Sequence, residues 1–292
     1  MATMEQNKKS IFLARNRIVY PQAIYHLTNR APGREVLFLE DSDYLHILSL
    51  VKEATHKFKW NVFCFCMMPN HVHFLIQINE ENLSQGAKNI FERYAKYFNK
   101  KYERKGPVFC KPFRASLCLD DSYLLVASLY IHLNPLKAKL VDNIEEYKWS
   151  SLGLYIKEDK STFVDYKFIL DMLSDNINGA KKMYRELLKS SAKVEYKNIS
   201  QDKNALIRFI LNFMKLKDLL NIKRIKREKS FLLWEEIGRC RNKKGSRQPK
   251  DLKAKCYLIE QLRANGYKIS EISSFLGVSR QTIYRWIQNV TK

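Results

Sequence analysis

The chain contains stretches with two different spacings of hydrophobic residues. In some stretches every second residue is apolar, a pattern typical of β-strands with one buried face. In others, apolar residues recur every three or four positions, as on one side of an amphipathic helix. Strands are predicted at residues 23–29, 60–67, 71–78 and 112–119, and helices at residues 41–58, 83–105 and 120–133. This order predicts an α+β fold in which helices cover an antiparallel sheet.

Two of the predicted strands, at residues 60–67 and 71–78, are separated only by Met68-Pro69-Asn70. A connection this short makes the two strands antiparallel neighbours in a hairpin. The complete series of elements is strand, helix, strand, strand, helix, strand and helix. This series predicts a ferredoxin-like layer of sheet and helices.

The pattern also divides the chain into regions. Residues 1–16 form a polar leader, and residues 17–155 contain the predicted sheet. Residues 156–230 are helical in pattern, rich in lysine and without a chemical motif, which predicts a helical connector. Residues 231–292 end in a pattern of two short helices, and we expect them to form a DNA-binding domain of the helix-turn-helix type.

The two short helices lie within residues 269–287. Ser270 and Ser279 can cap them, and Gly277 suits the left-handed turn between them. The shared core is expected to consist of Ile272, Leu276, Val278, Ile283 and Ile287. The candidate DNA-contacting residues, which face outward on the second helix, are Arg280, Gln281, Thr282, Tyr284 and Arg285. The alternative is a helical hairpin that contacts another protein.

The net charge suggests a class of partner. The chain has 52 Lys and Arg against 30 Asp and Glu, a formal net charge of +22. So large a surplus repels itself unless a polyanion is bound, which favours a nucleic acid. The N-terminus lacks an apolar signal core, and no run of about 18 apolar residues occurs. We therefore expect no membrane segment and a cytoplasmic, nucleoid-associated protein, either a monomer or a homodimer.

His71 and His73 are candidate metal ligands. They flank one apolar residue on a predicted strand, so both imidazoles project to the same face. Imidazole is a common ligand of divalent metals, although two hydrogen-bonded histidines on a half-buried face would show the same pattern. A zinc-binding structural module is a third interpretation, in which Cys64 or Cys66 joins the histidines. Both cysteines also fit as small packing residues.

Four motifs, taken in order, resemble the REP-associated tyrosine transposases, which are single-tyrosine HUH transposases. The resemblance covers about residues 17 to 155. The motifs are Met68-Pro69-Asn70-His71-Val72-His73, Arg93-Tyr94-Ala95-Lys96-Tyr97-Phe98-Asn99, Leu129-Tyr130-Ile131-His132-Leu133-Asn134-Pro135 and Trp149-Ser150-Ser151. The resemblance implies a ferredoxin-like catalytic domain that cuts single-stranded DNA, leaving a 5′-phosphotyrosine and a free 3′-hydroxyl.

The resemblance also implies the roles of individual residues. The nucleophile corresponds to Tyr130, and the metal ligands correspond to His71, His73 and Asn134. Two imidazoles and an amide oxygen would leave coordination positions open for phosphate and water, and Mg²⁺ or Mn²⁺ is the expected occupant. Asn134 has a second interpretation as the N-cap of a helix that starts at Pro135.

The expected partners are single-stranded or hairpin DNA at the catalytic domain and duplex DNA at the helix-turn-helix. Arg114, which shares a strand face with Ser116, is a further DNA-binding candidate. The expected activity is therefore that of a transposase, a metal-dependent nickase and strand transferase. The main alternative is a helix-turn-helix regulator whose transposase-like domain is inactive.

Overall fold

The computed structural model describes residues 19, 21–33, 35–110, 112–118, 121–157, 162–192, 255–256, 258–259, 262 and 267–291. The chain divides into two compact units. One contains the described residues up to Ala192 and the other contains those from Lys255 onward, and each unit is described by itself. Within the described residues, no helix is long and apolar enough to cross a membrane.

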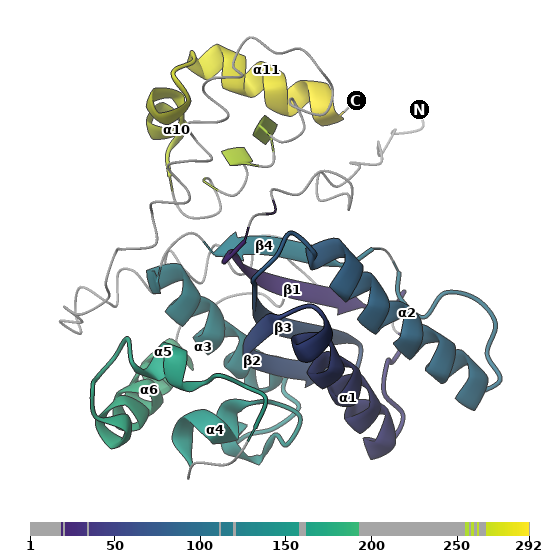
Figure 1. Ribbon diagram of the computed structural model, residues 1–292. Helices are drawn as coiled ribbons and strands as arrows, with labels where there is room; N and C mark the ends of the chain where they lie inside the picture. Colours follow the sequence, from purple (N-terminus) through teal and green to yellow (C-terminus); the bar gives the residue numbers. More distant parts are fainter. Residues whose placement is uncertain are drawn as a thin grey trace, which may run out of the picture. The chain divides into compact units, whose positions relative to one another are not determined.

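The first unit is built on a four-stranded antiparallel sheet with the strand order β2-β3-β1-β4. The strands are β1 (Ile24–Arg30), β2 (Trp60–Met68), β3 (His71–Ile78) and β4 (Arg114–Cys118). Pro69 and Asn70 alone connect β2 to β3, as the hairpin prediction required. The α+β class and the ferredoxin-like strand order are confirmed (Figure 1).

Helices cover both faces of this sheet. The helices α1 (Asp41–Lys57) and α2 (Leu83–Lys101) pack together on one face, and α3 (Asp121–Lys137) packs on the other, against β2, β3 and β4 (Figure 1). The strands β2 and β3 are almost wholly buried, because their apolar side chains face helices on both sides. α3 is therefore the helix that lies over the face bearing the histidines.

The helix α3 continues four residues beyond the predicted end, through Asn134 and Pro135. Its last turns are held by the Ala138 N–H, which donates to the Asn134 carbonyl at 2.9 Å, and by the Leu140 N–H, which donates to the Pro135 carbonyl at 3.0 Å. The Asn134 side chain donates to the Tyr130 carbonyl, one turn back, at 2.8 Å. An N-cap side chain accepts from the following turn, so the N-cap interpretation of Asn134 is wrong.

A network of buried hydrogen bonds joins α3, the helix that carries Tyr130, to the residues packed around it. His132 contacts the Tyr184 hydroxyl through Nδ1 at 2.8 Å and the Ser151 hydroxyl through Nε2 at 2.9 Å. Tyr184 donates to Ser128 at 2.9 Å, and Ser151 accepts from the Phe65 N–H of β2 at 2.9 Å. Ser151, the last residue of the Trp149-Ser150-Ser151 motif, therefore joins α3 to the edge strand β2.

The remaining helices of this unit follow α3. They are the 3₁₀ helix η1 (Ile144–Glu146), α4 (Leu152–Ile156), α5 (Lys167–Leu170) and α6 (Ile177–Ala192). Within the predicted connector the structure describes α5 and α6, and α6 packs against α3, α4 and α5. The second unit contains α10 (Ile269–Leu276) and α11 (Arg280–Thr291), which pack against each other.

The second unit has the predicted helix-turn-helix connection. Gly277 adopts the left-handed conformation with φ of 61°. Ser279 accepts from the Thr282 N–H at 3.1 Å and so caps α11. The prediction that Ser270 caps the first helix is wrong, because the N-cap is Lys268, whose N–H donates to Glu271 Oε2 at 2.6 Å.

Candidate active site

His71 and His73 occupy the first and third positions of β3, and both project to the face covered by α3. Their ring centroids are 4.8 Å apart. His73 is paired across the sheet with Thr28 and Cys66. The strand alternation therefore brings the two imidazoles together as the sequence predicted.

Tyr130 reaches the same place from α3. Its ring centroid is 6.1 Å from that of His73 and 6.3 Å from that of His26. Asn134 follows one turn later on the same side of α3, and both side chains are buried. Three of the four predicted catalytic and metal-binding residues, His71, His73 and Tyr130, thus lie together between β3 and α3, and Asn134 lies one turn beyond Tyr130 on the same helix.

Three atoms in this cluster carry lone pairs without a hydrogen-bond partner among the described residues. They are Nε2 of His71, Nε2 of His73 and Oδ1 of Asn134, and all three are buried. Buried polar atoms are normally hydrogen-bonded, so three buried atoms without a hydrogen bond suggest a ligand that binds them. Two imidazole nitrogens and an amide oxygen fit a divalent cation, so the donor set is compatible with the metal that the resemblance implies.

Burial keeps these imidazoles neutral. Desolvation, with a smaller contribution from the charge of Arg30, lowers the pKa of His71 to about 4. The pKa of His73 lies well below its ordinary value, because of desolvation first and its two neighbouring histidines second. At neutral pH each ring therefore has one nitrogen with a lone pair, which is the form that binds a metal.

Sequence reasoning missed two partners of the histidines. The Nε2 atom of His26 lies 2.9 Å from Nδ1 of His73, and Oδ1 of Asn70 lies 2.6 Å from Nδ1 of His71. Asn70 precedes His71 directly, so its adjacency was a usable signal. His26 lies on another strand, and only the β1–β3 register brings it beside His73.

Two arginines flank the cluster on the same face of the sheet. Arg30 on β1 is paired with His71, and its side chain is exposed. Arg114 on β4 is paired with Thr28, which is itself paired with His73. The sequence predicted Arg114, whereas Arg30 was missed because its place beside His71 depends on the register of β1.

The cysteines do not complete a metal site. Cys64 and Cys66 are buried free thiols, and burial raises the pKa of both, as for small packing residues in a core. The described part of the chain contains no group of three His, Cys, Asp or Glu side chains placed to hold a metal. The described residues therefore do not form the Cys and His site that the zinc-module interpretation requires.

The second motif of the resemblance lies away from the histidines. It belongs to α2, on the opposite face of the sheet, where the Tyr94 hydroxyl donates to the Leu37 carbonyl and Arg93 forms an ion pair with Glu53 at 2.5 Å. Its residues hold the fold together and do not line the cluster.

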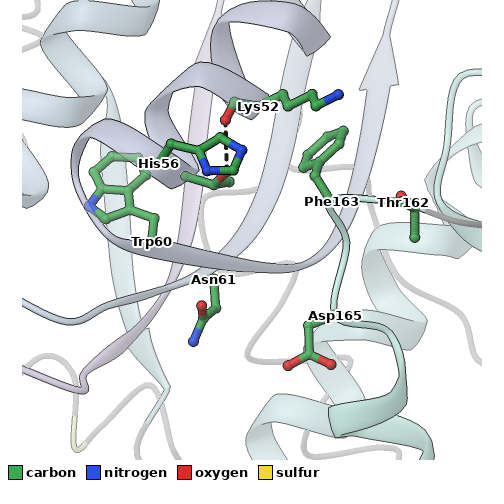
Figure 2. A pocket seen from close by; sticks show the side chains of 8 residues that line it. Lys52, His56, Trp60, Asn61, Thr162, Phe163 and Asp165 are labelled. Carbon is green, nitrogen blue, oxygen red and sulfur yellow. Dashed lines mark hydrogen bonds between the residues drawn. The ribbon is translucent and has the colours of Figure 1, made fainter.

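A separate open pocket of about 620 Å³ lies at the other end of β2 (Figure 2). Trp60, on its wall, is paired with Ile78, whereas His71 is paired with Met68 at the far end of the hairpin. The pocket is lined by Lys52, Thr55, His56, Trp60, Asn61, Thr162, Phe163 and Asp165. It contains none of the clustered residues.

In the helix-turn-helix unit, most candidate DNA-contacting side chains point to solvent. Arg280, Gln281, Tyr284 and Arg285 are exposed, while Thr282 is half-buried and its hydroxyl lies 2.9 Å from that of Ser279. In the predicted core, Ile272, Leu276 and Ile283 are buried, and Val278 and Ile287 are half-buried.

Comparisons with known proteins find similarities for both parts of the chain. Residues 19–134 match the family described as IS200-like transposases, and residues 250–292 match the homeodomain-like domain family. A Haemophilus influenzae protein, whose name describes it as a REP-associated tyrosine transposase, is 27% identical over 131 residues, which cover 40% of this chain and 74% of that protein. A solved structure of a REP-associated tyrosine transposase bound to a REP hairpin aligns with a TM-score of 0.41 and 14% identity, over 46% of this chain and 79% of that chain.

Proposed function

We propose that this protein, whose residues 19–134 match the IS200-like transposase family, cuts and transfers single-stranded DNA through a covalent bond to Tyr130. One observation carries the proposal. The Tyr130 ring lies beside a histidine pair whose two Nε2 atoms are buried without a hydrogen-bond partner in the described residues. Strand cleavage by a tyrosine needs the hydroxyl close to groups that can bind a divalent metal, and the Nε2 atoms of His71 and His73 are such groups.

His71, His73 and Asn134 would hold the divalent cation, Mg²⁺ or Mn²⁺. When bound, this cation would polarise the scissile phosphate and draw charge from it. The Tyr130 oxygen forms a bond to phosphorus, the bond from phosphorus to the 3′ oxygen breaks, and the tyrosine proton passes to solvent while the leaving oxygen takes up a proton. Strand transfer reverses these steps when the 3′-hydroxyl of another strand attacks the phosphotyrosine.

Arg30 and Arg114 would bind the DNA backbone beside the reacting phosphate. Both lie on the histidine-bearing face, one and two strands from β3. Guanidinium groups bind phosphate through paired hydrogen bonds, and the net charge of +22 adds a general attraction. As the name of the Haemophilus relative refers to REP sequences, we propose REP-like hairpin DNA with adjoining single strands as the substrate.

The direct test is cleavage of a labelled single strand that contains a hairpin, with Mn²⁺, analysed on a denaturing gel. The wild-type protein should release a fragment with a free 3′-hydroxyl and retain the other fragment covalently. His73→Ala should lower the cleavage rate by about 10³-fold or more, because it removes a metal ligand. His56→Ala, at an exposed histidine of α1, is the matched control and should cleave normally. Unchanged cleavage by His73→Ala would rule out this site.

The helix-turn-helix would bring the nuclease to duplex DNA. We expect Arg280→Ala with Arg285→Ala to weaken duplex binding and to reduce the slope of log affinity against log salt by about 2, since two phosphate contacts would be lost. Single-strand cleavage should persist. Arg185→Ala, which removes an exposed charge from α6, is the control for charge alone. A variant that binds duplex DNA like the wild type would indicate that α11 contacts another protein.

The alternative function is a helix-turn-helix regulator with an inactive first unit. The exposed arginines of α11 would serve a regulator equally well. A wild-type protein that binds duplex DNA but never cleaves the hairpin strand would favour this alternative.

A further inference from the structure

In His71 and His73, the two proposed metal ligands, the ring nitrogens have the same pattern of hydrogen bonds. In each ring Nδ1 has a partner, and in each ring Nε2 has none among the described residues. A neutral imidazole carries its proton on only one nitrogen, so the partner of Nδ1 decides whether Nε2 has a lone pair.

Asn70 determines the tautomer of His71. The atom 2.6 Å from His71 Nδ1 is Asn70 Oδ1, which can only accept a hydrogen bond. His71 Nδ1 must therefore carry the proton and donate it, which leaves the lone pair on Nε2. The Asn70 carbonyl also accepts from the Ala31 N–H at 2.9 Å, so the turn that carries this amide is itself held in place.

His26 is the partner of His73. Its ring is stacked on the His73 ring, with centroids 5.1 Å apart and planes 14° from parallel, and its Nε2 lies 2.9 Å from His73 Nδ1. Only one of the two nitrogens can donate. When His73 donates, its own Nε2 keeps the lone pair, and the lone pairs of both ligand histidines become available together.

We propose that His26 and Asn70 are positioning residues that fix the tautomer and orientation of His73 and His71, so that both Nε2 lone pairs are presented to one cation. This inference rests on the proposed function and adds to it the residues that prepare the metal site before the metal binds. Outer partners of this kind typically strengthen metal binding by about 10- to 100-fold. The contacts of His26 and Asn70 also hold the rings of His73 and His71 in one orientation at the start of β3.

The first test uses metal-free wild-type protein at neutral pH. Nitrogen-15 NMR correlations of the histidine side chains distinguish protonated from unprotonated ring nitrogens, and His71→Ala and His73→Ala assign the signals. We expect protonated Nδ1 and unprotonated Nε2 in both rings. A protonated Nε2 in either ring would refute the assignment for that ring, whether or not the protein cleaves DNA.

The second test measures Mn²⁺ affinity by calorimetry on the full chain. His26→Leu and Asn70→Ala should each weaken binding by about 10- to 100-fold, because the ligand ring loses its partner. His26→Gln and Asn70→Asp keep an acceptor oxygen at the same place and should bind Mn²⁺ near the wild-type affinity. Circular dichroism spectra of all four variants check that the fold is retained.

The outcomes separate this inference from the proposed function. Wild-type affinity in His26→Leu and Asn70→Ala, with binding lost in His73→Ala, would overturn the inference and leave the metal site standing. Equal losses in His26→Leu and His26→Gln would show that His26 acts by packing alone, and would also overturn the inference. A wild-type protein that neither binds Mn²⁺ nor cleaves would refute the proposed function, while the NMR test would still decide the tautomers.

Discussion

Tyr130→Phe is expected to fold and to bind single-stranded DNA like the wild type while forming no covalent adduct with it. The substitution keeps the buried ring, which packs 6.1 Å from His73, and removes only the oxygen that would bond to phosphorus. Loss of a nucleophile should lower the cleavage rate by about 10³-fold or more, since no other group could replace it. Adduct formation on a denaturing protein gel, followed by mass spectrometry of the DNA-linked peptide, measures the effect.

Two other buried tyrosines provide matched controls. Tyr94→Phe removes a hydroxyl that donates to the Leu37 carbonyl on the opposite face of the sheet, and Tyr123→Phe changes a residue two turns before Tyr130 on α3. Both should form the adduct. A DNA-linked peptide centred on Tyr94, Tyr97 or Tyr123, or an undiminished adduct in Tyr130→Phe, would show that a different tyrosine is the nucleophile.

His132→Ala is expected to lower the free energy of unfolding by about 2–5 kcal/mol at pH 7. His132 is fully buried, and its two ring nitrogens join Tyr184 and Ser151. Truncation removes both hydrogen bonds and leaves a cavity beneath α3. Urea unfolding followed by tryptophan fluorescence measures the loss, with His56→Ala as the exposed control. An unchanged midpoint would mean that the network does not stabilise the fold.

The same residue should make stability depend on pH. Burial lowers the pKa of His132 from 6.5 to about 3 in the folded protein. Below pH 6.5 His132 is protonated in the unfolded chain but stays neutral in the folded protein. The contribution of His132 to the free energy of unfolding is therefore fully present above pH 6.5 and is lost as the pH falls towards 3. Across that window His132 contributes on the order of a few kcal/mol. His132→Ala should show a shallower decline than the wild type, and His56→Ala should retain the wild-type slope. Parallel curves for all three proteins would contradict this account.

The local parts of the site were predictable from the sequence. The placement of His71 and His73 on one face follows from strand alternation, and the hairpin follows from a connection of a few residues. The choice of Tyr130 followed from the family resemblance, and the packing of α3 over the histidines confirms that its ring is in reach.

The long-range parts were not predictable. His26 and Arg30 face the candidate metal ligands His73 and His71 only because β1 pairs with β3 in one register, and a shift of one residue would turn both to the other side. The end of α3 was misplaced because a proline usually stops a helix. Here the helix passes through Pro135, because tertiary packing of its buried residues outweighs the lost backbone hydrogen bond.

The complete burial of Tyr130 has a consequence for the kinetics of the reaction. A phosphate cannot approach a buried oxygen, so if Tyr130 is the proposed nucleophile, the arrangement described above would be a resting state and the reactive state would be more open. The free energy of that opening would be drawn from DNA binding, and the apparent affinity for DNA would fall in proportion to the fraction of molecules that are open. Discrimination between DNA substrates would then arise before any bond is broken, because a strand that binds too weakly to hold the site open would not reach Tyr130.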